Sequence, residues 1–428
     1  MRLGLKPAAG VAALVMAATA CGGGGSGDET VELRFSWWGA DDRHETTQEV
    51  IKRFEEANPD IKVTGEYTDW SSYWDRLATN TAANDAPDII TQEERYLREY
   101  ADRGALLDLN EVGDQLDTSK LDQLVMGGGE LDGGLYAVPT GVNAFTVMAD
   151  PQAFEEAGVE MPDDETWTWQ DWVDTAAEIS EKSGGDIIGT QDMAFNEQSF
   201  QIFARQREQS LYDKSGALNF DQSTMTEYWE YMQQVHEEGG APGASKSVEV
   251  EAGGPDQSVL ANNSGAMASF WTNQLGTMEE TSGRDLELLR FPGESESAQA
   301  GTFFKPAMHY SISSETEHPE EAAKFVDFLV NDKQAGELIL ADRGLPANTD
   351  LRDELMSELP AADQESAEFL DEIEGDVAGA VPPPPIGAGD VVDITMRINE
   401  DLMFGDITPE QASKRWTSEV QDATGGGE

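Results

Sequence analysis

Residues 31–63 read VELRFSWWGADDRHETTQEVIKRFEEANPDIKV, and this stretch decides the fold class. Apolar and polar residues alternate strictly from 31 to 37, which predicts a half-buried strand. A helix follows and ends at Asn58-Pro59, and its apolar face comprises Val50, Ile51, Phe54 and Ala57. A second strand is expected at 61–67. The order strand, helix, strand predicts an α/β fold with a largely parallel sheet and ligand sites at the carboxyl ends of its strands.

The alternation of strands and helices continues down the chain. Helices are expected at 73–83 and 95–102, with a short buried strand at 88–90 between them. Single strands are predicted at 135–139 and 142–149. Three later helices carry start signals, namely Thr168 with Asp171 as a capping box, Pro319, and Thr408-Pro409. The four prolines at 382–385 predict a stiff extended bridge.

The first 27 residues predict export and attachment to a membrane. Arg2 and Lys6 precede an apolar run that ends in the small residues 18–20, which is the layout of a signal peptide over residues 1–20. The next residue, Cys21, is the single cysteine of the chain and is followed by a Gly-rich linker to residue 29. We interpret Cys21 as a lipobox cysteine that receives a diacylglycerol. The alternative is a secreted protein with a chance cysteine, which would have no disulfide partner.

Composition limits the classes of partner. The chain has 428 residues and a formal net charge of −57, so its surface repels nucleic acid and anionic lipid headgroups. The roughly 400 residues after the signal are too many for one core and enough for two lobes. No later segment is apolar enough to cross a bilayer. We therefore expect a monomer without a nucleic-acid partner that touches the membrane only through its lipid.

Motifs for metal, cofactor or nucleophilic chemistry are absent from the sequence. The histidines, at positions 44, 236, 309 and 318, are too scattered for a zinc motif, and no lysine follows Gly127-Gly128-Gly129 at phosphate-loop spacing. We expect no cofactor, no metal and no catalytic residues. A secreted glycoside hydrolase stays open as an alternative, because among 84 acidic residues a carboxylate pair can always be imagined.

Four stretches of the chain, in order, resemble one known family. They are residues 50–63, with VIKRFEEANPDIKV; residues 86–106, with APDII and YADRGAL; residues 135–158, with LYAVP and FEEAG; and residues 317–346, with EHPEEAAKF and RGLP. Together they resemble the lipid-anchored extracellular solute-binding proteins of ABC importers, of the maltose-binding type. The resemblance covers nearly the whole mature chain.

This resemblance implies a two-lobe fold with a ligand cleft between the lobes. Crossover strands are expected near 140–145 and 302–310. The first lobe would comprise residues 30–142 and 308–345, and the second lobe residues 143–307 and 346–428. The implied function is capture of a mono- or oligosaccharide and its delivery to an ABC permease by lobe closure. A binding protein for another polar solute remains an alternative.

The resemblance also indicates positions for ligand contacts. Trp271 matches a tryptophan that stacks on sugar, and Asn143, at the first crossover, matches a contact position. Further candidates lie in loops that relatives use, and they are Trp38, Asp41, Gln92, Glu93, Trp70, Tyr73 and Arg343. A sugar site needs such residues, because aromatic faces cover the apolar side of a pyranose and planar polar groups bind its hydroxyls.

Several of these aromatic and charged residues also have a structural interpretation. Trp37 shares the apolar face of Phe35 and is assigned to the core, as are Trp167, Trp169 and Trp172. Trp70, Tyr73 and Trp74 could form a cleft wall or a core. Glu93 and Glu94 could be surface charges, and Arg343 could cap a helix. Lys305 and His309 lie in the second crossover region, where position favours the cleft and residue type does not.

Overall fold

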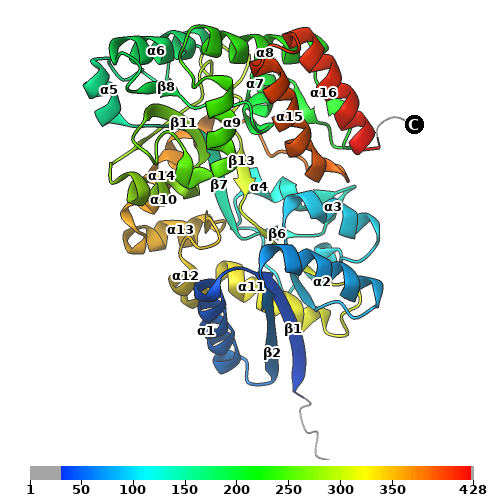
Figure 1. Ribbon diagram of the computed structural model, residues 1–428. Coiled ribbons are helices and arrows are strands. Elements are labelled where there is room, and N and C mark those ends of the chain that lie inside the picture. Colours follow the sequence, from blue (N-terminus) through cyan, green and yellow to red (C-terminus); the bar gives the residue numbers. More distant parts are fainter. Residues whose placement is uncertain (1–29, 426–428) are drawn as a thin grey trace, which may run out of the picture.

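Two β-sheets, each covered by helices, divide the molecule into two lobes (Figure 1). The computed structural model describes residues 30–425, so the predicted signal peptide and Cys21 lie outside the described residues. Lobe 1 here means the five-stranded sheet and its helices, drawn mainly in blue and yellow. Lobe 2 means the larger sheet and its helices, drawn mainly in green, orange and red.

The sheet of lobe 1 has the strand order β2-β1-β3-β14-β6. Its strands are β1 (Val31–Trp38), β2 (Ile61–Thr68), β3 (Ile89–Gln92), β14 (His309–Ile312) and β6 (Val138–Pro139). The first three pair in parallel, as predicted, and β14 runs antiparallel to β3 and β6. The surrounding helices are α1 (Asp41–Ala57), α2 (Trp70–Ala82), α3 (Glu94–Asp102), α11 (Pro319–Asn331) and α12 (Lys333–Ile339).

The core of lobe 1 forms where α1 and α11 bury their apolar faces against the sheet. Phe35, Phe54 and Phe325 are fully buried, and the ring centroid of Phe325 lies 5.4 Å from that of Phe35 and 4.9 Å from that of Phe54. Trp37 is 1% exposed, which confirms its predicted place in the core. Helix α11 therefore packs against both β1 and α1 in this core.

The sheet of lobe 2 has the strand order β12-β7-β11-β8. These strands are β12 (Glu287–Leu289), β7 (Gly141–Ala149), β11 (Gly265–Trp271) and β8 (Ile188–Thr190). Its helices are α5 (Pro151–Ala157), α6 (Trp169–Lys182), α7 (Gln198–Arg205), α8 (Gln222–Glu237), α9 (Ala244–Gly253), α10 (Leu275–Ser282), α14 (Ala361–Ile373), α15 (Val391–Met403) and α16 (Pro409–Ala423). Trp167, Trp169 and Trp172 are buried in this lobe, as predicted. A small hairpin joins β9 (Ser210–Tyr212) to β10 (Leu218–Asn219).

The predicted crossovers correspond to the places where the chain passes from one sheet to the other. The chain passes from β6 in lobe 1 to β7, and from β13 (Phe304–Pro306), which pairs with β7, to β14. The two-residue strand β15 (Leu345–Pro346) also pairs with β7. A Cβ at Gly141 would lie 2.4 Å from the carbonyl oxygen of Arg343, so this close approach requires glycine. Two short helices, α4 (Gln123–Met126) and α13 (Thr349–Leu355), lie beside the junction.

The helix starts that the sequence signals are confirmed. Thr168 and Asp171 form both hydrogen bonds of a capping box at α6, and Thr408 and Gln411 do the same at α16. Pro319 stands in the first turn of α11. These signals succeed because a cap depends on side chains and amides only three residues apart.

The single strand expected at 135–139 is wrong, because the segment divides between two structures. Leu135 belongs to β5 (Gly134–Leu135), which forms a hairpin with β4 (Glu130–Leu131), whereas Val138 joins the sheet of lobe 1 beside Tyr310. Both halves are apolar, so hydropathy does not reveal the change of partner. None of the helices within residues 30–425 combines the length and apolar character needed to cross a bilayer.

Candidate functional site

A pocket opens where the N-terminus of α3 in lobe 1 faces lobe 2. Its empty volume is ≈ 930 Å³, which includes the solvent at its mouth. Lobe 1 supplies Glu94 and Arg95, and the crossover strand β13 supplies Lys305. The remaining residues that we discuss come from lobe 2 and the segment before α15, and they are Asn196, Glu197, Gln198, Gln201, Tyr212, Trp271, Phe303, Pro382 and Pro384. Both lobes therefore contribute polar groups to one pocket.

Trp271 presents its ring to this pocket from the end of β11. The side chain is half-buried, and its ring centroid lies 5.0 Å from that of Phe145 and 6.2 Å from that of Phe303. The main-chain N–H of Trp271 donates to the Gln274 side chain at 3.0 Å, which holds the strand end in place. The indole is thus an aromatic side chain of the pocket lining that is supported by two phenylalanine rings.

An ion-pair network lies beside this plate. The ammonium nitrogen of Lys305 lies 5.1 Å from the ring centroid of Trp271 and 3.0 Å from Oε1 of Glu94. Its distance to Oε1 of Glu93 is 3.8 Å, and Glu93 also pairs with Nε of Arg95 at 3.1 Å. Two carboxylates and two cations therefore neutralise each other across the lobe boundary.

The protonation of this network follows from burial and charge. Burial alone would lower the pKa of Lys305, but Glu94 and Glu93 outweigh it and raise that pKa above its ordinary value. Burial alone would raise the pKa of Glu93, but Lys305 and Arg95 outweigh it and lower that pKa. Burial prevails at Glu94, whose pKa is raised despite Lys305. Lys305 and Glu93 are accordingly charged at neutral pH.

The segment that enters α7 supplies a row of polar side chains. The Asn196 side chain accepts from the main-chain N–H of Gln198 at 3.0 Å, and Gln198 Nε2 donates to Glu197 Oε1 at 2.8 Å. Oε2 of Glu197 is buried and has no hydrogen-bond partner among the described residues. A carboxylate oxygen in that state is a strong acceptor for a donor group on a ligand.

A second depression continues beyond Trp271 into lobe 2. It is lined by Asn196 and Trp271, which also line the first pocket, and by Phe145, Ser269 and Gln274 among others. Its empty volume is ≈ 680 Å³, and the hydroxyl of Ser269 is buried without a partner among the described residues. The two hollows share the indole of Trp271, so a solute longer than one ring could span both.

The sequence of this chain matches a family model over residues 49–366, and that family is described as bacterial extracellular solute-binding proteins. The match covers more than half of the chain. The chain belongs to this family. The predicted relationship and the two-lobe α/β fold are thereby confirmed.

Similar proteins extend this comparison. A putative ABC transporter periplasmic-binding protein, YcjN, of Escherichia coli is 23% identical over 320 residues, which are 72% of this chain and 70% of that protein. A family 1 extracellular solute-binding protein of Alicyclobacillus acidocaldarius has a solved structure that superposes with a TM-score of 0.77 at 28% identity, covering 92% of this chain and 98% of that one. A periplasmic oligogalacturonide-binding protein of Yersinia enterocolitica shares the fold, with a TM-score of 0.80 at 22% identity, over 92% of this chain and 99% of that one.

Of the predicted site residues, Trp271 lines the pocket of this solute-binding protein directly, and two others lie just behind the pocket wall. Glu93 caps α3 and anchors Arg95 and Lys305. Asn143 is paired in register with Lys305 on the neighbouring strand; it is 6% exposed, and its Oδ1 is buried without a partner among the described residues. Glu93 therefore pairs with Lys305, whereas Asn143 lies opposite Lys305 without a side-chain hydrogen bond to it.

Three predicted aromatic residues form a separate cluster at the edge of lobe 1. The ring centroid of Trp38 lies 4.9 Å from that of Trp70 and 5.2 Å from that of Tyr73. Tyr73 is 2% exposed, and its hydroxyl donates to the carbonyl oxygen of Thr91 at 2.7 Å. Trp70 is 40% exposed. None of the three is among the described residues that line the pocket.

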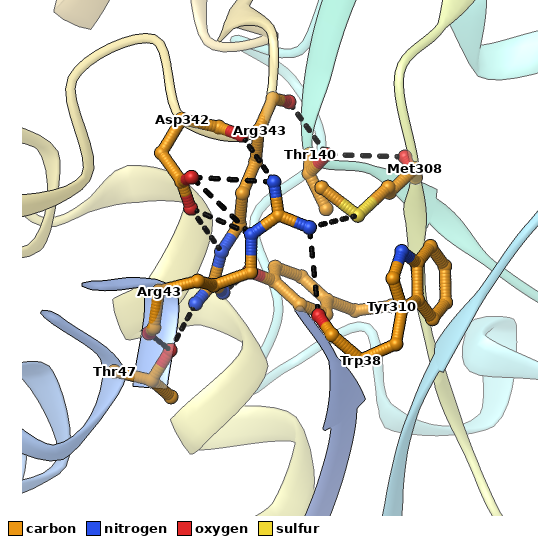
Figure 2. Close-up of polar contacts among 8 residues, drawn as sticks. All are labelled: Trp38, Arg43, Thr47, Thr140, Met308, Tyr310, Asp342 and Arg343. Atoms are coloured by element: carbon orange, nitrogen blue, oxygen red, sulfur yellow. Dashed lines mark hydrogen bonds and ion pairs between the residues drawn. The ribbon is translucent and has the colours of Figure 1, made fainter. Parts of the chain in front are cut away.

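Arg343 serves the interior of lobe 1 (Figure 2). Its guanidinium donates to the hydroxyls of Tyr310 and Thr47, and the side chain is 3% exposed. Arg43 lies beside it and pairs with Asp342 at 2.9 Å. This network ties α1 to the loop before β15. Asp41 stands exposed in the first turn of α1, outside the lining of the pocket.

Gln92 lies at the carboxyl end of β3, where the parallel sheet was expected to present ligand contacts. The residue is fully buried and pairs in register with His309, and the side-chain polar atoms of both residues have no partner among those described. Burial lowers the pKa of His309 to about 4, so its imidazole is neutral at pH 7. The pair lies within the sheet of lobe 1.

Sequence reasoning missed most of the polar pocket residues. The sequence did not predict contacts at Glu94, Arg95, Glu197, Gln198 and Gln201. Glu94 was interpreted as a possible surface charge, and Lys305 was placed near the cleft by position only. A signal existed in the run Asn196-Glu197-Gln198, three polar residues that directly precede the apolar turn of α7 and follow a short strand by a loop. Such a run at a strand's carboxyl side is a typical position for ligand contacts.

Proposed function

We propose that this solute-binding protein is the lipid-anchored receptor of an ABC importer and that its solute is a carbohydrate. The observation that carries the proposal is the supported indole of Trp271 with polar groups from both lobes around it. A pyranose ring has an apolar C–H face and a rim of hydroxyls. An aromatic plate with planar amides and carboxylates at its edge is complementary to both.

Individual roles follow from the chemistry of each side chain. Trp271 stacks on a sugar ring, and the amides of Gln198 and Gln201 can donate to and accept from hydroxyls. Glu94 and Glu197 can accept hydrogen bonds from hydroxyls of the sugar. Glu93 acts one layer behind by pairing with Lys305. Asn143 lies opposite Lys305 on the neighbouring strand, and its Oδ1, which has no partner among the described residues, can accept from a sugar hydroxyl.

Delivery depends on closure of the lobes around the sugar. Glu94 and Arg95 stand on lobe 1, whereas Trp271 and the α7 residues stand on lobe 2, so a bound sugar bridges the two. A ligand stabilises the closed state only by its differential affinity for that state. The permease would then recognise the closed arrangement. The predicted lobe boundaries, at 142–143, 307–308 and 345–346, belong to this proposal.

Three similarities support the transport role. The YcjN relative is named an ABC transporter periplasmic-binding protein, and a relative from Streptomyces antibioticus is named a lipoprotein, at 26% identity over 40% of this chain. An ABC substrate-binding protein of Listeria monocytogenes that shares the fold was solved with cycloalternan. In this proposal, lipidated Cys21 keeps the receptor at the extracytoplasmic face of the cell membrane, beside its permease.

The test is a thermal-shift screen of the folded protein against mono- and oligosaccharides, followed by calorimetry on each hit. A ligand raises the apparent stability by RT ln(1 + [L]/Kd), so a binder is detected by its melting shift. The sugar should be recovered chemically intact after incubation. New reducing ends would instead indicate a hydrolase, and shifts only with non-sugar polar solutes would overturn the carbohydrate assignment.

A further inference from the structure

The cations of the pocket are already committed to carboxylates of the protein. Lys305 lies 3.0 Å from Glu94 and 3.8 Å from Glu93, and Arg95 lies 3.1 Å from Glu93. Among the pocket-lining residues that the structure describes, Arg95 and Lys305 are the cations, and each pairs with a carboxylate of the protein.

Withdrawing either cation from this network would leave a buried carboxylate behind. Glu93 is 7% exposed, and its ionised state depends on Arg95 and Lys305. A ligand carboxylate that recruited Lys305 would have to compete with Glu93 and Glu94 at once. Removing one partner of a buried pair is costly, because the remaining charge is desolvated and unpaired.

Glu197 is a further carboxylate in the pocket lining, and it forms no ion pair within 4 Å with any described residue. Its Oε1 accepts from a neutral amide, and its buried Oε2 has no partner among the described residues. This oxygen suits a hydroxyl donor. The same oxygen repels a carboxylate, sulfate or phosphate on a sugar that fills the pocket, and the low local dielectric strengthens the repulsion.

We propose that the pocket selects carbohydrates without anionic groups and rejects acidic sugars of the same size and linkage. This inference rests on the proposed carbohydrate function and specifies its substrate class. Neutral hydroxyls satisfy Glu197 and Glu94, whereas an acidic group meets these two carboxylates and cations that already pair with carboxylates of the protein.

Matched pairs of sugars test the selectivity of the wild-type protein. Calorimetry at pH 7 and 0.15 M salt compares α-1,4-galactobiose with α-1,4-digalacturonate, and cellobiose and longer neutral oligomers with their uronic acid counterparts. We expect binding to favour the neutral member by about 100-fold, since like charges at close range cost several kcal/mol. Equal or tighter binding of the acidic member would overturn the inference and leave the carbohydrate function intact. Binding of no carbohydrate would overturn both.

A variant identifies the carboxylate responsible. Glu197→Gln keeps the shape of the side chain and removes its charge, so the disadvantage of the acidic sugar should shrink about tenfold. The matched control is Glu230→Gln, an exposed carboxylate on α8 that removes the same net charge away from the pocket. If Glu230→Gln raises the affinity for acidic sugar as much as Glu197→Gln does, the effect comes from the net charge of the whole surface. That result would overturn the local selectivity.

Discussion

The guanidinium of Arg98 on α3 donates from Nε to the carbonyl oxygen of Pro384 at 3.3 Å, which joins lobe 1 to lobe 2 beside the pocket. Its Nη2 donates to the carbonyl oxygens of Lys214 and Pro383, at 3.2 and 3.3 Å. The side chain is 8% exposed although it is charged. The proline segment thus supplies acceptors for a cation from the opposite lobe.

Arg98→Ala should weaken sugar binding, because the closed arrangement loses these charge-assisted hydrogen bonds. We expect a loss of about 1–2 kcal/mol, or roughly 5- to 30-fold in Kd. Calorimetry measures the affinity, and small-angle scattering of the unliganded protein should show a larger radius of gyration. Arg103→Ala, at the exposed end of the same helix, is the control and should change neither quantity. Unchanged affinity in Arg98→Ala would remove this contact from lobe closure.

Trp271→Ala should cost about 2–4 kcal/mol of sugar affinity, since aromatic anchors dominate such contacts. The half-buried ring also packs on Phe145, so the melting temperature should fall modestly. Trp70→Ala is the matched control, because Trp70 is an exposed tryptophan outside the pocket lining and should leave affinity unchanged. A large melting loss with normal affinity would assign Trp271 to the core instead.

Lys305→Met should destabilise the protein by about 3 kcal/mol, because Glu93 and Glu94 then face each other without a shared cation. Adding Glu94→Gln should recover part of that loss, since one of the two charges disappears. Urea unfolding of the two single variants and the double variant measures the coupling. Additive effects of the two changes would show that the ion pair contributes nothing specific.

Both ring nitrogens of His236 face acceptors in the folded state. Nε2 lies 2.9 Å from Oδ2 of Asp192, and Nδ1 lies 3.0 Å from the carbonyl oxygen of Pro242, so the protonated imidazole can donate from both nitrogens. Burial alone would lower the pKa of His236, but Asp192 outweighs it and raises the pKa above 6.5. The Asp192 pKa is lowered below 3.8 despite burial, mainly by the hydrogen bond from His236.

Stability should therefore depend on pH in a defined direction. The raised His236 pKa contributes stability that is complete below about pH 6.5 and lost as the pH rises through the folded value. The lowered Asp192 pKa contributes stability above about pH 3.8 that is lost as the pH falls through its folded value. Melting temperatures from pH 5 to 9 should decline above pH 6.5. His236→Gln should flatten this decline, and His318→Gln should not; equal profiles would contradict the assignment.

Cys21→Ala should release the protein into the medium or leave an uncleaved precursor, because no thiol remains to receive the lipid. Sugar affinity of the folded part should stay unchanged, since the pocket-lining residues that the structure describes lie far along the chain from residue 21. Membrane fractionation with a blot measures the distribution. A cleaved variant that stays as firmly bound to the membrane as the parent would contradict the lipoprotein assignment.

The sequence predicted the features that depend on interactions between residues close together in the chain. The parallel start of the sheet, the buried Trp37 and the capping box at Thr168 depend on residues within one helical turn or along one alternating strand. Hydrogen bonds and hydrophobic periodicity at that range involve residues close together in the sequence, so the sequence predicts them. The family stretches added the two-lobe arrangement, and Trp271 followed from them as a residue of the pocket.

Only the tertiary structure decided which distant groups meet. Lys305 pairs with Glu94 across more than two hundred residues, Arg98 reaches Pro384, and Arg343 turns inward to Tyr310 instead of the pocket. The split of 135–139 between a hairpin and a sheet has the same origin. An ion pair or a strand pairing between such positions depends on the path of the whole chain through both lobes, and side-chain type alone carries no information on that path.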